Sequence, residues 1–160
     1  MSILKSADTW FFEKASFGLD GSLVIEIVEG IQSEEKELVE IDDNNSLGPY
    51  YPVKVTENSS IVAVKFSGVL TYSTTNESYD IGDDQLIKKG KYLFECTNSR
   101  YLNNIKNSTS IDGLAENYKH YFLWTEDYLI DVIATESPII EKLNKSADMS
   151  IERTITYNAK

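Results

Sequence analysis

The sequence predicts a mainly β protein, a single antiparallel β-sandwich or partly closed barrel with one short helix near residues 99–107. Three observations predict this class. Strand-forming residues recur in short runs, two-residue turn sequences separate several of these runs, and only one segment has helical spacing of its apolar residues. The 160 residues, 41% of them hydrophobic, are expected to form one domain over residues 1–160 that buries roughly 70% of its unfolded surface.

The first predicted hairpin spans residues 12–29. Its turn is expected at Asp20-Gly21, a dipeptide that accepts the positive φ angles of a two-residue hairpin turn. In that register Phe17 faces Val24 across the two strands.

The middle of the chain continues as strands with polar connections. Residues 43–49 are rich in Asn, Gly and Pro and are expected to form a loop, and residues 80–89 a polar connection. Val, Tyr, Phe and Thr favour strands. The expected strands lie at residues 36–42, 51–57, 60–67, 69–79 and 91–96.

The one predicted helix is short. Ser99 can accept a hydrogen bond at the start of a helix over residues 100–106, and Leu102 and Ile105 would share one face of it.

The clearest predicted strand pair joins residues 118–125 to residues 128–135 through a two-residue turn. This register places His120 opposite Ile133, and it makes His120 and Asp131 diagonal neighbours about 7–8 Å apart, within reach of their side chains. The more apolar face is expected to be the core, and it carries Tyr121, Leu123, Thr125, Tyr128, Ile130, Val132 and Ala134.

The last segments are less regular. Residues 139–143, after Pro138, fit either an edge strand or a turn of helix. Residues 144–160 are polar enough to form a frayed tail, although Ile151–Tyr157 alternates as a final strand would.

A catalytic triad can be drawn from the few nucleophilic and basic side chains. Asp131 could orient the His120 imidazole as a general base, and Cys96 would supply the nucleophile. However, Cys96 has neither a glycine-rich turn nor a helix start to expose it and lower its pKa, so a structural His–Asp contact is the favoured interpretation.

Composition excludes several other classes of site. One Cys and one His exclude a disulfide framework and multi-His or Cys-rich metal centres, and the net charge of −11 disfavours nucleic acid and anionic membranes. The loop that begins at Asp42 resembles a calcium loop, but Leu47 and Val53 occupy its required Gly and Glu positions. No cofactor or metal is therefore expected, and without a secretory signal the expected location is cytoplasmic.

The negative charge is concentrated near the amino terminus. Residues 1–50 hold 11 acidic and 3 basic side chains, a net charge of −8. One interpretation is a docking surface for a basic partner, and the other is a solvated hairpin whose charges protect an exposed strand edge from aggregation. The residues concerned are Glu26, Glu29, Glu34, Glu35, Glu37, Glu40, Asp42 and Asp43.

A scattered pattern over residues 10–140 resembles a family of small uncharacterised bacterial proteins. It consists of Val64-x-Phe66, Tyr72, Asn76-Glu77-Ser78-Tyr79, Ser99-x-Tyr101-Leu102, His120-Tyr121, Ile130-Asp131-Val132-Ile133 and Pro138. The resemblance implies no particular reaction, and the chain is also similar in size and charge to acidic immunity proteins encoded beside toxins. Within the pattern, Glu77, Ser99, His120 and Asp131 are polar positions among aromatic ones, which form either a buried hydrogen-bonded network, the favoured interpretation, or a shared pocket.

The leading hypothesis is a non-enzymatic cytoplasmic factor whose acidic surface binds a basic protein, such as a toxin. A second hypothesis is a small hydrolase or ligand-binding barrel with its site around Glu77, His120 and Asp131. A third is a structural module that forms homo-oligomers through exposed strand edges.

Overall fold

The computed structural model describes residues 3–42, 45–110, 117–144 and 153–154. It confirms a mainly β fold, with several antiparallel sheets arranged as in a β-sandwich and no closed barrel among the described strands. The first sheet has the strand order β1 (Trp10–Phe17), β2 (Leu23–Glu29), β7 (Ile61–Phe66), β13 (Ile139–Leu143). The second has the order β8 (Val69–Asn76), β12 (Tyr128–Ala134), β11 (Lys119–Trp124), β10 (Leu93–Thr97), β9 (Ile87–Lys91).

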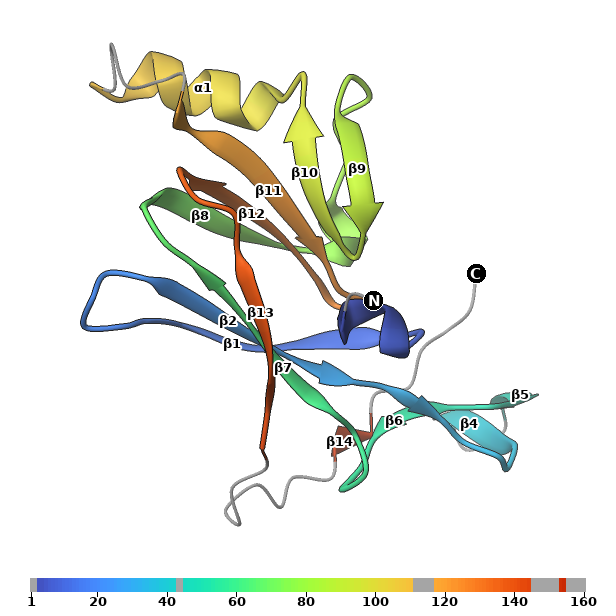
Figure 1. The fold of residues 1–160 in the computed structure, drawn as a ribbon. Coiled ribbons are helices and arrows are strands. Elements are labelled where there is room, and N and C mark those ends of the chain that lie inside the picture. Colours follow the sequence, from blue (N-terminus) through green and yellow to red (C-terminus); the bar gives the residue numbers. More distant parts are fainter. Residues whose placement is uncertain (1–2, 43–44, 111–116, 145–152, 155–160) are drawn as a thin grey trace.

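Two smaller sheets extend from one end of this sandwich (Figure 1). One has the order β14 (Arg153–Thr154), β6 (Val53–Val55), β3 (Ile31–Gln32), and the other pairs β4 (Glu37–Asp42) with β5 (Asn45–Tyr50). Within the described ranges, the helical elements include the short 3-10 helices η1 (Ile3–Ser6) and η2 (Glu77–Tyr79) and the α-helix α1 (Arg100–Ser108). The predicted helix near residues 99–107 is therefore confirmed.

The main core lies between the first two sheets. Alternate residues of β2 and β7 from one sheet pack against alternate residues of β11 and β12 from the other, because successive side chains of a strand point to opposite faces. The Trp10 indole N–H donates to the Leu4 carbonyl at 3.0 Å, so η1 is held against the same core. The strand residues of the main core that are completely shielded from solvent are Leu23, Ile25, Ile27, Val62, Val64, Phe66, Leu123, Ile130, Val132 and Ala134.

The β11–β12 hairpin has the predicted register. His120 pairs with Ile133 and Phe122 with Asp131, and the face expected to be apolar is the one in the core. The two-residue turn also joins the sheets, since the Asp127 carboxylate accepts a hydrogen bond from the Phe12 backbone N–H at 2.9 Å.

The predicted register of the first hairpin is wrong by one residue. Phe17 pairs with Leu23 instead of Val24, because the turn is a longer loop in which the Gly18 N–H donates to the Ser22 carbonyl at 2.8 Å. Asp20 holds this loop. Its carboxylate accepts hydrogen bonds from the Ser22 backbone N–H at 3.1 Å and from the Ser22 hydroxyl at 2.6 Å.

Two predicted connections contain strands. Residues 45–49, expected to be part of a loop, belong to β5, and residues 87–89, expected to be part of a polar connection, begin β9. Residues 139–143 form an edge strand, the first of the two alternatives. Most of the predicted tail at 144–160 lies outside the described residues, and within it Arg153 and Thr154 pair with β6.

Candidate functional site

The acidic arm comprises residues 33–52 and consists of the β4–β5 hairpin with its two flanking segments. A hydrogen bond from the Ser33 N–H to the Pro52 carbonyl, 2.8 Å long, closes its base. Figure 1 shows β4 and β5 beyond the edge of the sandwich, and neither strand belongs to one of the two large sheets. The arm holds six acidic residues and one basic residue, Lys36, so its net charge is −5.

The structure divides the seven described members of the predicted acidic set into two groups. Glu26 lies on β2 with its carboxylate 3.2 Å from Lys14, and the Glu29 carboxylate accepts a hydrogen bond from the Ser60 N–H at 3.0 Å. Both are half-buried parts of the sandwich, so they serve its structure. The other described members are exposed on the arm and are Glu34, Glu35, Glu37, Glu40 and Asp42, while Asp43 lies outside the described residues.

The contacts made by the carboxylates of the arm leave most of this charge facing solvent. The Glu37 carboxylate is paired with the Lys54 ammonium at 2.5 Å, and the Asp42 carboxylate accepts hydrogen bonds from the Asn45 side chain at 2.9 Å. Glu37, Asp42 and Asn45 are exposed and Lys54 is half-buried, so these contacts at the surface contribute little to stability.

Large apolar and aromatic side chains are exposed among the acids of the arm. Leu38 and Ile41 are 62% and 60% exposed, although large apolar side chains are usually buried in the core of a protein of this size. The arm therefore combines charge that attracts cations with apolar surface that gains from removal from water. The exposed set is Leu38, Ile41, Leu47, Tyr50 and Tyr51.

The structure brings His120 and Asp131 together on the outer face of the five-stranded sheet. His120 Nε2 lies 2.8 Å from Asp131 Oδ1, so the predicted diagonal contact forms. The His120 ring is 1% exposed and packs under α1, 5.5 Å between ring centroids from Tyr101. Its Nδ1 atom is buried and has no hydrogen-bond partner among the described residues.

Cys96 is the direct cross-strand neighbour of His120 in the β10–β11 pair, so the three residues of the predicted triad share one face. Burial raises the pKa of the Cys96 thiol to about 11, and the residue is 5% exposed. Such a thiol stays protonated at neutral pH and is barely reached by solvent, so it is a poor nucleophile. The geometry therefore favours a structural role for this cluster.

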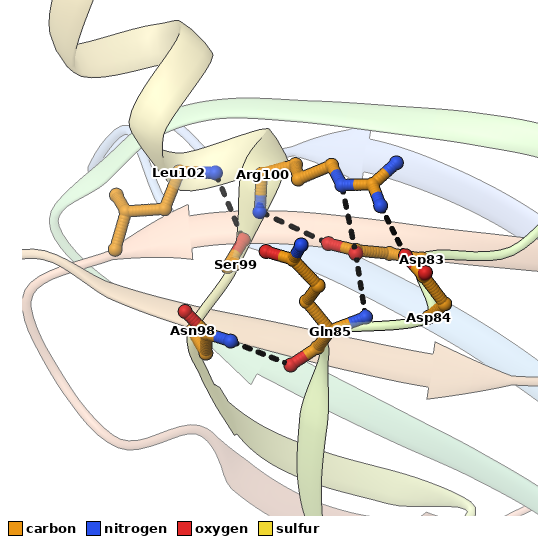
Figure 2. A network of polar contacts seen from close by, with 7 residues as sticks. All are labelled: Asp83, Asp84, Gln85, Asn98, Ser99, Arg100 and Leu102. Carbon is orange, nitrogen blue, oxygen red and sulfur yellow. Dashed lines mark hydrogen bonds and ion pairs between the residues drawn. The ribbon is translucent and has the colours of Figure 1, made fainter.

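Ser99 positions the helix that covers the cluster (Figure 2). Its hydroxyl accepts a hydrogen bond from the Leu102 N–H at 2.9 Å, as predicted for the first residue of a helix. Ser99 is buried, and this hydrogen bond satisfies its polar hydroxyl there.

The start of α1 is also tied to residues 83–85. Asp83 accepts a hydrogen bond from the Arg100 backbone N–H at 3.0 Å, which lowers the pKa of that carboxyl, and the Arg100 guanidinium pairs with both Asp83 and Asp84 (Figure 2). The Asn98 amide donates to the Gln85 carbonyl at 2.9 Å. Sequence reasoning missed this network, because nothing local connects Asp83 with a residue 17 positions later.

Glu77 does not lie with the other predicted polar positions. It is exposed on η2, and its N–H donates to the Asp127 carbonyl at 3.1 Å, beside the turn of the β11–β12 hairpin. His120 lies near the other end of that hairpin, about six strand residues or roughly 20 Å away. The side chains of Glu77, His120 and Asp131 thus do not converge on one site.

Comparisons with protein-family models, with curated proteins and with solved structures gave no match. Among the described residues, no group of three or more His, Cys, Asp or Glu side chains is arranged to hold a metal ion. Within the same part of the chain, no helix is long and apolar enough to cross a membrane.

Proposed function

We propose that the chain is a non-enzymatic binding factor that engages a basic protein through its acidic arm. The observation that carries this proposal is the combination, on one projecting hairpin, of five exposed described carboxylates with five exposed large apolar or aromatic side chains.

The two kinds of side chain have different parts in such binding. Concentrated charge speeds the encounter with an oppositely charged protein and selects among partners, and its effect weakens with salt. Apolar and aromatic side chains that become buried supply most of the affinity. A partner of this arm would therefore carry Lys or Arg around an apolar recess.

A toxin is the proposed class of basic partner. The similarity to immunity proteins in size and in acidic charge supports this choice, because an immunity factor must bind its toxin quickly and shield its surface.

The test is affinity capture with three forms of the tagged chain followed by mass spectrometry. The arm variant carries E34K, E35K and E40K, and the control variant carries the same charge change at exposed residues of other segments, E57K, E136K and E141K. The wild type and the control variant should capture the same basic protein, and the arm variant should lose it. Equal capture of that protein by the arm variant would remove the arm from the mechanism.

A further inference from the structure

Strand β9 is a basic edge of the five-stranded sheet. It is the terminal strand of that sheet, so one of its backbone edges has no strand partner among the described residues. All five of its residues are exposed, and three of them are the lysines Lys88, Lys89 and Lys91. An unpaired strand edge is a template for another strand.

Strand β9 itself is basic, whereas the arm is acidic, and exposed apolar side chains lie on or near both; the connection before β9 also carries Asp80, and Asp83 and Asp84, which pair with Arg100. Residues 87–91 contain no acidic side chain, so this strand has a charge of +3. Ile87 on the strand is 62% exposed, and Tyr79 and Ile81 in the preceding connection are 82% and 99% exposed. Lys88 Nζ lies 3.7 Å from the centre of the Phe122 ring. On the paired strand β10, the one acidic residue opposite β9 is Glu95, which faces Lys89.

The arm offers a matching strand. β4 has six residues against five in β9, and in the two-stranded sheet of the arm it also has an edge with no strand partner among the described residues. Opposite charges on directly paired strands stabilise the pairing. β9, the outer neighbour of β10, lies at the end of the molecule that carries α1, and the arm lies at the other end, so the two surfaces do not meet within one chain (Figure 1).

We propose that the acidic arm of one copy docks along the β9 edge of a second copy. This inference goes beyond the proposed function, since it needs no foreign partner, but it uses the same arm. The contact joins two different surfaces, so each dimer keeps one unused arm and one unused β9 edge, and further copies can add to form chains or a ring. A bound basic partner and a second copy would then exclude each other from the arm.

Sedimentation velocity over a concentration series at low salt tests the inference. The edge variant carries K88E, K89E and K91E, and the arm variant is the one defined above. The wild type should grow in mean mass with concentration and return to a monomer at high salt, and each variant alone should associate at least about tenfold more weakly. A wild type that stays monomeric at every concentration overturns the proposal, as does association that neither reversal weakens.

Two further samples separate this contact from general charge effects. An equimolar mixture of the two variants should associate again, because the intact arm of the edge variant fits the intact edge of the arm variant, and the reversed arm fits the reversed edge. A chain that carries both reversals has the wild-type net charge of −11, and it should associate again. A mixture that stays monomeric, or a doubly reversed chain that is folded by circular dichroism but monomeric, contradicts the proposed pairing.

The outcome also separates the two proposals. If the wild type is monomeric but still captures its basic partner, only the self-association is wrong. If the edge variant itself loses the captured protein, β9 contacts a foreign partner, and the proposal of a second copy fails.

Discussion

Cys96 allows a direct test of whether the cluster beneath α1 is structural or contains an activated nucleophile. The perturbation is modification by Ellman's reagent, which reports thiol reaction by absorbance, and the chain has only one Cys, so the signal is unambiguous. The reaction is followed with the native protein and with the chain unfolded in denaturant, at the same pH near neutrality.

The expected magnitude follows from the environment of the thiol. Burial raises the pKa of Cys96 to about 11 from an ordinary value of 9.0, so below both values the thiolate population falls by about 100-fold. The more basic thiolate is the better nucleophile, which recovers a factor of about 10. The native thiol should thus react about tenfold more slowly than the unfolded one, and more slowly still because only 5% of the residue is exposed.

Two variants complete this test. Cys96→Ala gives the background signal, and His120→Phe removes the imidazole while leaving an aromatic ring under α1. If the cluster is structural, loss of the imidazole does not slow the reaction. A native thiol that reacts as fast as the unfolded one, and that slows in His120→Phe, would refute the reasoning and point to an imidazole that activates the thiol.

Three other predictions concern stability and are checked by urea unfolding. Gly68→Ala should cost at least about 1 kcal/mol more than Gly82→Ala, because both glycines have positive φ angles but only at Gly68 would a Cβ atom lie 2.0 Å from the Thr135 hydroxyl; equal losses would contradict this. Ser99→Ala should cost about 1 kcal/mol and reduce the helical signal in circular dichroism, and an unchanged midpoint would show that the cap is not needed. Hydrogen bonds, chiefly from the Ser22 hydroxyl, lower the pKa of the Asp20 carboxyl. The ionised carboxylate therefore stabilises the fold fully at a pH well above 3.8, the ordinary pKa, and this stabilisation is lost as the pH falls below 3.8. Between about pH 6 and pH 3, Asp20→Asn should therefore lose less stability than the wild type loses.

The last hairpin could be predicted from the sequence because its information is local. A two-residue turn leaves one choice of register, and the alternation on both strands agrees with it, so the contact of His120 with Asp131 follows from the sequence alone. The cap formed by Ser99 is local in the same sense. The place of Cys96 opposite His120 was not predictable, because β10 and β11 are separated along the chain by α1.

The predictions that are wrong depend on contacts that composition does not record. Asp20-Gly21 is typical of a two-residue turn, but the Asp20 carboxylate binds Ser22, and the last strand pair is Phe17 with Leu23. The loop thus takes two residues from the first expected strand and one from the second, which shifts the register by one residue. β5 contains Gly and Pro, and β9 contains three lysines, so neither has the composition of a strand. Both exist because a neighbouring strand pairs with their backbones.

The strand order of the first sheet has a consequence for synthesis of the chain. β7 pairs with β2 on one side and with β13 on the other, and the ends of β7 and β13 are 77 residues apart, from Phe66 to Leu143. At a usual rate of about 5–20 residues per second, roughly 4–15 s pass on the ribosome before the second partner of β7 has been made. Throughout that interval an apolar strand edge is exposed to other nascent chains, so demand for a chaperone should depend on translation speed between these two strands.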